Sequence, residues 1–156
     1  GGSMSSRLFQ HIREDRGLAY AVFSGLTTYS DAGAITVYAG CAADKVGEVI
    51  DLTMAELAEL RRTPVGAAEL QRAKDHLKGS LMLSLENTSS RMSQLARHEI
   101  YFGRHFSLDE LLSAIDEVTA DDVQQVAVDL FSGGAPVATI VGPALEERIT
   151  ADRLRI

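Results

Sequence analysis

The stretch from Met4 to Gly40 constrains the fold most, because it changes from helical to strand periodicity within a few residues. Its first part is amphipathic, with two adjacent serines that can cap its start and Gly17 as a left-handed stop. Two β-type runs follow, at 19–26 and 34–40, and turn-forming residues separate them. We therefore predict a short helix followed by a β-hairpin.

After the hairpin, apolar residues return to helical spacing. Asp44 is the expected N-cap of the first of these helices, and Thr63-Pro64 is its expected end, because the residue before a proline avoids helical backbone angles. Ser107–Glu110 and Thr119–Asp122 resemble capping boxes. The predicted segments are helices at 44–63, 65–85, 92–103, 107–116 and 119–133, a buried strand at 136–142, and a charged tail that could form one loose helix at 144–156.

This order of elements favours an α+β fold: a mainly antiparallel sheet with a layer of helices on one face. Strands and helices do not alternate, so a doubly wound fold matches poorly. A length of 156 residues fits a single domain, 1–156, with enough residues for a sizeable core.

The composition excludes several classes of protein. A net charge of −7 argues against a nucleic-acid surface, which normally carries a basic stripe. No apolar run reaches the length that spans a bilayer, and no signal peptide precedes the first helix, so we predict no membrane partner and a cytoplasmic protein. The single Cys41 excludes an internal disulfide, and we interpret it as a small buried apolar residue.

The residue patterns predict no catalytic centre within this chain. A nucleophile elbow, a phosphate loop and a dinucleotide fingerprint are all missing. The four histidines have no metal-binding spacing, so we predict no metal and no cofactor here, and we interpret the last two as helix-end residues. The histidines are His11, His76, His98 and His105.

Several short motifs occur in the order found in one known family. The matching residues are Ser5–Phe9, Arg13-Glu14, Arg16–Tyr20, Asp31–Gly33, Glu69–Lys74 and Val118–Val123. This set resembles the last domain of the pitrilysin-type zinc peptidases, the family of insulin-degrading enzyme and the mitochondrial processing peptidase. The resemblance covers about residues 1–142.

The resemblance implies a division of labour. The family holds its zinc with a His-x-x-Glu-His helix, a pattern that this sequence lacks. Zinc, its ligands and the water-activating glutamate are then expected in an N-terminal catalytic half or a partner subunit. An arginine and a tyrosine seven residues apart, which match Arg13 and Tyr20, hold peptide carbonyls in the family and help to polarise the scissile bond. From spacing alone, the favoured interpretation is that Arg13 is a surface cation on a helix and Tyr20 a strand aromatic; the surrounding family motifs favour the binding role.

The resemblance therefore predicts the C-terminal, substrate-clamping part of a zinc metalloendopeptidase, inactive alone and acting on a peptide or protein. The alternative is an inactive scaffold or assembly subunit of the same family. The composition is compatible with a bacterial source. In the family the domain begins further upstream, so we interpret this chain as an excised fragment. It should then form a homo-oligomer, with its tail (143–156) extended or exchanged between protomers.

Overall fold

The computed structural model describes residues 1–133, 136–143 and 149–156. The chain forms two compact units, and each is described here by itself. Unit 1 consists of residues 1–63 and 127–156, and unit 2 of residues 64–126. The expectation of one domain over 1–156 stays a prediction.

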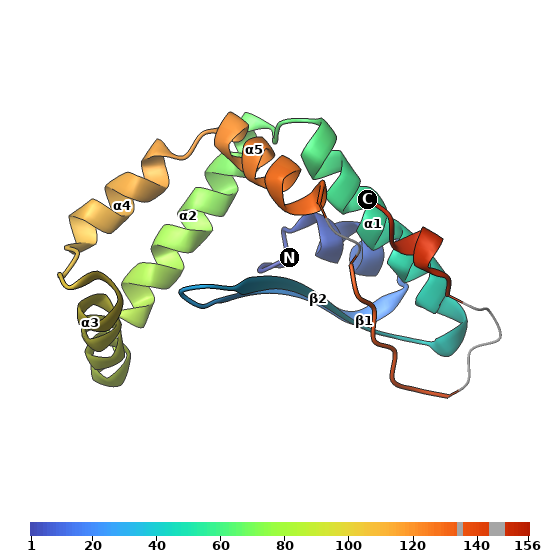
Figure 1. Ribbon diagram of the computed structural model, residues 1–156, viewed down its shortest axis with the longest axis horizontal. Coiled ribbons are helices and arrows are strands. Elements are labelled where there is room, and N and C mark those ends of the chain that lie inside the picture. Colours follow the sequence, from blue (N-terminus) through green and yellow to red (C-terminus); the bar gives the residue numbers. More distant parts are fainter. Residues whose placement is uncertain (134–135, 144–148) are drawn as a thin grey trace. The chain divides into compact units, whose positions relative to one another are not determined.

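The predicted hairpin is confirmed in unit 1 and is longer than expected. Strand β1 (Ala19–Thr28) pairs antiparallel with β2 (Gly33–Cys41), as Figure 1 shows. Phe23 lies opposite Tyr38 and Val22 lies opposite Ala39. Because successive strand residues point to opposite faces, these two pairs mark the two faces of the sheet.

The predicted first helix is present, and it is wound as a π-helix, η1 (Phe9–Glu14). The Ser6 hydroxyl accepts a hydrogen bond from the Phe9 amide at 3.3 Å, so Ser6 is the capping serine. Gly17 adopts a φ of 61°, the left-handed conformation expected for a helix stop. Its amide donates to the Arg13 carbonyl at 3.0 Å, and the Leu18 amide donates to the Ile12 carbonyl at 2.9 Å.

The core of unit 1 lies on one face of the hairpin. Ile12 is its largest fully buried side chain. Helix α1 (Val46–Arg62) contributes Val49, and Cys41 packs against the cluster as a partly buried residue. The other buried members are Leu8, Leu18, Ala19 and Val22. Helices therefore cover one face of the sheet, and the α+β class is confirmed.

Helix α1 ends as predicted but begins differently. Thr63 is extended (φ −130°, ψ 128°), which agrees with the effect of the following proline. At the other end, a 3₁₀ turn, η2 (Ala43–Lys45), precedes the helix, and its first residues receive no side-chain cap. The expected Asp44 cap is wrong, because Asp44 lies inside this turn and not at its boundary.

Unit 2 is helical. It contains α2 (Ala67–Ser84), α3 (Thr88–Phe102), α4 (Leu108–Glu117) and the first part of α5 (Ala120–Phe131). Asn87 caps α3 by accepting from the Ser89 and Ser90 amides, and Gly103 ends it at a φ of 63°. Both predicted capping boxes are confirmed, at Ser107/Glu110 and at Thr119/Asp122.

The prediction of a buried strand at 136–142 is wrong. Val137 and Val141 are 94% and 95% exposed, and among the described residues the only strand ladder is that of β1 and β2. A strand needs hydrogen bonds to a neighbour, and an apolar run cannot supply them alone. Gly134 and residues 144–148, parts of the predicted helix stop and tail, lie outside the described residues.

The last described residues of the tail lie against α1 of the same unit. They form a 3₁₀ turn, η3 (Ala151–Leu154). The Arg153 guanidinium donates to both carboxylate oxygens of Asp51, at 3.0 and 2.8 Å. A forked guanidinium suits this two-point pairing, which ties the chain end to α1.

Candidate functional site

Tyr20 lies on the face of the hairpin that is turned away from the core. It is 73% exposed, whereas its neighbour Ala19 is buried. The pairing of β1 with β2 is irregular between Ala19 and Ala21, so Tyr20 is an extra residue without a directly paired partner. Such a bulge re-aims a side chain. Here it turns the Tyr20 ring over β2.

The ring of Tyr20 rests on Gly40. A β-carbon added to Gly40 would lie 2.6 Å from Cε1 and Cζ of Tyr20 and 2.8 Å from its hydroxyl oxygen. These separations are too short for any real contact of that kind. The ring therefore occupies the space that a side chain at position 40 would need.

Two further aromatic residues continue this face. The rings of Phe23 and Tyr38 stack with centroids 5.0 Å apart and planes at 24°. A side-chain hydrogen bond with Tyr20 raises the pKa of Tyr38 above its ordinary value, and repulsion from an ionised Tyr20 and slight desolvation act in the same direction. The three aromatic residues and Gly40 form what we call the outer aromatic face: Tyr20, Phe23, Tyr38 and Gly40.

Arg13 lies near the end of η1, just before the Gly17 turn. Its guanidinium carbon lies 4.8 Å from the centroid of the Phe9 ring, which is a cation–π arrangement. Its Nε lies 3.8 Å from a carboxylate oxygen of Glu14, and the side chain is 44% exposed. Both partners belong to the same helix, so the forked guanidinium retains donors that face solvent.

The structure does not join Arg13 to Tyr20. Each is held by its own neighbours, Arg13 by residues of η1 and Tyr20 by residues of β2. What links them is the short Gly17 turn, whose backbone hydrogen bonds connect the end of η1 to the start of β1. Arg13 and Tyr20, both exposed hydrogen-bond donors, therefore lie on either side of the hydrogen-bonded Gly17 turn.

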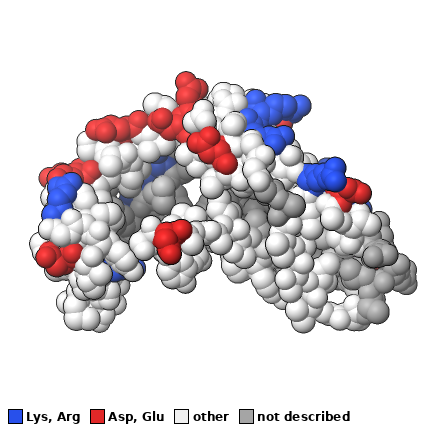
Figure 2. All heavy atoms as spheres, viewed as in Figure 1, with Lys and Arg blue, Asp and Glu red and all other residues white. Residues whose placement is uncertain are grey.

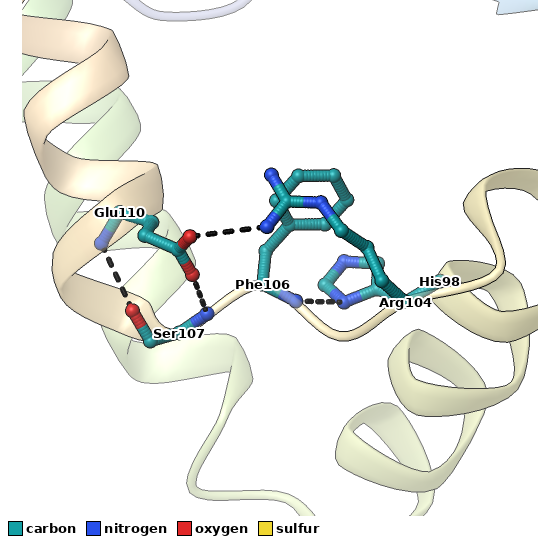
Figure 3. Close-up of polar contacts among 5 residues, drawn as sticks. All are labelled: His98, Arg104, Phe106, Ser107 and Glu110. Atoms are coloured by element: carbon teal, nitrogen blue, oxygen red, sulfur yellow. Dashed lines mark hydrogen bonds and ion pairs between the residues drawn. The ribbon is translucent and has the colours of Figure 1, made fainter.

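The histidines that were candidates for metal binding have structural surroundings. His98 Nδ1 accepts from the Phe106 amide at 3.4 Å, as Figure 3 shows, and its ring meets those of Phe102 and Phe106 edge to face. His105 Nε2 lies 3.9 Å from a carboxylate oxygen of Glu99. In the described part of the chain, no group of three or more His, Cys, Asp or Glu side chains could hold a metal ion. These residues therefore do not fit a zinc site.

The connection between α3 and α4 in unit 2 holds the side chains around His98 in place. Figure 3 also shows the capping box of α4, in which the Ser107 hydroxyl accepts from the Glu110 amide at 3.2 Å and Glu110 accepts from the Ser107 amide at 2.7 Å. Arg104 donates to Glu110 at 3.2 Å and lies 3.9 Å from the Phe106 ring centroid. These contacts stabilise the connection between α3 and α4, and they give each of these polar side chains a structural partner.

A hollow of about 390 Å³ lies between α2 and α3 in unit 2. Serine hydroxyls and the Arg97 guanidinium supply its polar lining. A nucleophilic serine needs an adjacent base, and neither a histidine nor a carboxylate lines this hollow. It therefore offers no catalytic site.

Cys41 packs against the core from β2 but is only partly buried, less than the buried residue that was predicted. Partial burial raises the pKa of its thiol, and the nearby Asp44 carboxylate adds to the effect. A raised pKa keeps the thiol protonated and weakly nucleophilic at neutral pH. The structure thus agrees with a packing role for Cys41.

The surface charges show no broad basic area on the face drawn in Figure 2. Lys and Arg side chains there form separate groups, and acidic side chains lie among them. None of the helices in the described ranges is both long and apolar enough to cross a membrane.

Sequence reasoning identified Arg13 and Tyr20 but missed the residues that surround Tyr20. The pairing of Phe23 with Tyr38 follows from the register of the hairpin. Alternation along each predicted strand could therefore have placed both rings on one face. The bulge at Tyr20 leaves no comparable pattern in the sequence.

Comparison with known proteins now gives the fold and the site a context. The family model described as the Peptidase M16 inactive domain matches residues 1–77. The zinc protease YmxG of Bacillus subtilis is 42% identical over 90% of this chain and 34% of its own length. A zinc protease of Mycobacterium tuberculosis is also 42% identical, over 99% of this chain and 35% of its own length.

A solved structure shows the same fold at lower similarity. A chain of complex III2 from Candida albicans, with Inz-5 bound, matches 80% of this chain and 30% of its own length, with a TM-score of 0.72 and 24% identity. The present chain spans about a third of the length of the curated relatives that it matches. These findings place the chain beside relatives that are named zinc proteases. The chain belongs to the M16 peptidase family and corresponds to its C-terminal, inactive domain.

Proposed function

We propose that this chain binds and positions a peptide substrate for hydrolysis by a zinc site elsewhere in the full-length protein or in a partner subunit. One observation carries the proposal: the Tyr20 ring is 73% exposed on the sheet face opposite the core. Exposure alone does not distinguish Tyr20 from Tyr29, which is 71% exposed. Tyr20 differs because it stands at a bulge, with its ring placed over Gly40, next to the turn that carries Arg13.

Arg13 and Tyr20 are better suited to bind the backbone of a peptide than to recognise one particular side chain of the peptide. A guanidinium offers several donors in a fixed fork, and a phenol offers one directional donor on a stiff ring. Carbonyl oxygens are the acceptors common to every peptide. Arg13 and Tyr20 would therefore hold peptide carbonyls, and a donor aimed at a developing oxyanion is worth about 2.7–4 kcal/mol.

Zinc belongs to this proposal only outside the chain. The relatives are named zinc proteases, whereas the described residues offer no cluster of metal ligands. The role proposed for Arg13 and Tyr20 is to bind and orient the peptide, and this role requires no metal ion bound by this chain.

The test uses the full-length protein and its cleavage of a fluorogenic peptide. Tyr20→Phe keeps the ring and removes one donor, so we expect kcat/KM to fall roughly 100-fold if that donor acts on the oxyanion. Arg13→Ala should lower kcat/KM as well. Tyr29→Phe is the matched control, because Tyr29 is equally exposed, at 71%, but lies beyond the end of β1. Thermal stability and zinc content should stay unchanged in all three variants.

The rival proposal is an inactive scaffold subunit of the same family. If it is correct, the full-length protein should not cleave peptides, and Tyr20→Phe should not affect subunit assembly. Cleavage that is unaffected by both Tyr20→Phe and Arg13→Ala would contradict the clamping role directly.

A further inference from the structure

The Tyr20 hydroxyl is more constrained than its exposure suggests. An exposed side chain normally samples several staggered rotamers. Here the ring lies on Gly40, and a β-carbon at that position would force the ring to move. Gly40 does not adopt a positive φ, because among the described glycines only Gly17 and Gly103 do so. Glycine at position 40 therefore matters for the space that it leaves to the ring and not for a left-handed backbone.

Tyr38 restricts the position of the Tyr20 hydroxyl as well. It stands two residues before Gly40 on β2 and so shares its face. A side-chain hydrogen bond joins the hydroxyls of Tyr38 and Tyr20.

A phenol can both donate and accept, so the Tyr20 hydroxyl can pair with a further group beside Tyr38. The stack of Phe23 on Tyr38 holds the Tyr38 ring in place from the opposite strand. Phe23, Tyr38 and Gly40 together define where the Tyr20 hydroxyl lies.

We infer that Gly40 and Tyr38 are positioning residues for Tyr20: Gly40 leaves the space that the ring occupies, and Tyr38 holds the hydroxyl, through their hydrogen bond, where it can donate to a peptide carbonyl. The inference rests on the proposed function, in which Tyr20 binds that carbonyl. Pre-organised donors are valuable because a displacement of about 1 Å at a reacting group can cost on the order of 100-fold in rate.

The main test compares two glycines of the same hairpin in the full-length protein. A β-carbon on Gly40 would overlap the Tyr20 ring, whereas one on Gly25 of β1 would meet nothing within 4 Å. We expect Gly40→Ala to lower kcat for peptide cleavage roughly 10- to 100-fold and Gly25→Ala to leave it unchanged. Equal effects of the two substitutions would overturn the seating role of Gly40.

A double-variant cycle tests Tyr38. Tyr38→Phe keeps the stack on Phe23 and removes the hydroxyl, so we expect a loss of about 5-fold in kcat, the value of one neutral hydrogen bond. If Tyr38 acts through Tyr20, Tyr38→Phe should have no further effect in a Tyr20→Phe background. A loss that adds fully to that of Tyr20→Phe would show that Tyr38 does not act through Tyr20.

A titration that does not depend on activity completes the test. In protein labelled with ¹³C-tyrosine, the pKa of Tyr38 should fall toward its ordinary value when Tyr20→Phe removes the partner hydroxyl. An unchanged pKa would refute the hydrogen bond, even if Gly40→Ala failed to fold. Unchanged kinetics of Tyr20→Phe alone would instead refute the proposed function, and the positioning roles would fall with it.

Discussion

Replacing Ile12 with alanine should be the most damaging single truncation in unit 1. Ile12 is fully buried and lies among side chains from η1, β1 and α1. The substitution removes Cγ1, Cγ2 and Cδ1. At about 0.8 kcal/mol for each buried carbon group, the transfer contribution is about 2.4 kcal/mol.

The cavity adds to this cost. Neighbours close such a cavity only partly when separate elements hold them, as β1 and α1 hold Val22 and Val49. We therefore expect Ile12→Ala to lower the free energy of unfolding by about 3–4 kcal/mol and Ile12→Val by about 1 kcal/mol. Val137→Ala is the control, because Val137 is 94% exposed in the same unit, and its effect should stay within about 0.5 kcal/mol.

Urea unfolding followed by tyrosine fluorescence suits this measurement. The chain has 4 tyrosines and no tryptophan, and Tyr20, Tyr29 and Tyr38 all lie in unit 1. The midpoint should fall while the slope with urea stays constant. A loss below about 1 kcal/mol for Ile12→Ala, at an unchanged slope, would show that the contacts around Ile12 do not form the core of unit 1.

Two further predictions concern pH and self-association. Hydrogen bonds from Ser107 and Thr119 lower the pKa values of Glu110 and Asp122, so their stabilising effect is present above the unfolded pKa values and is lost as pH falls through the folded ones. Below about pH 4 the melting temperature of the wild type should therefore fall more steeply with pH than that of the double variant Glu110→Gln/Asp122→Asn. Parallel plots of melting temperature against pH would contradict the stabilising role of these two carboxylates. The exposed Val137 and Val141 should promote oligomers, so sedimentation velocity should show association that grows with concentration and weakens in Val137→Lys/Val141→Lys. A wild type that stays monomeric at all concentrations would remove the homo-oligomer prediction.

The sequence predicted those elements that are determined by local chemistry. Gly17 ends η1 because its left-handed backbone is a property of that one residue. The Ser107 box forms within four consecutive residues, and Thr63 is extended because Pro64 follows it. In each case the physical cause lies next to its effect in the chain.

The wrong Asp44 cap was a local error, but the wrong strand and the missed surroundings of Tyr20 have causes that lie far away in the sequence. Whether the run at 136–142 forms a strand depends on a neighbouring strand, and its composition holds no information about one. The seat of Tyr20 depends on a bulge and on Gly40, which stands 20 residues further along the chain. The family resemblance pointed to Tyr20, but only the pairing of β1 with β2 shows what holds it.

The hairpin separates stability from binding by using its two faces differently. Val22 and Ala39 face the core, so substitutions there act first on folding. Phe23 and Tyr38 are directly paired on the other face, where their rings stack and Tyr38 forms a hydrogen bond with Tyr20. Because successive residues alternate between faces, one ladder of backbone hydrogen bonds holds both sets in register. The buried face can thus keep the backbone under Tyr20 rigid while the ring itself stays accessible, which is the arrangement that a fixed hydrogen-bond donor for a peptide requires.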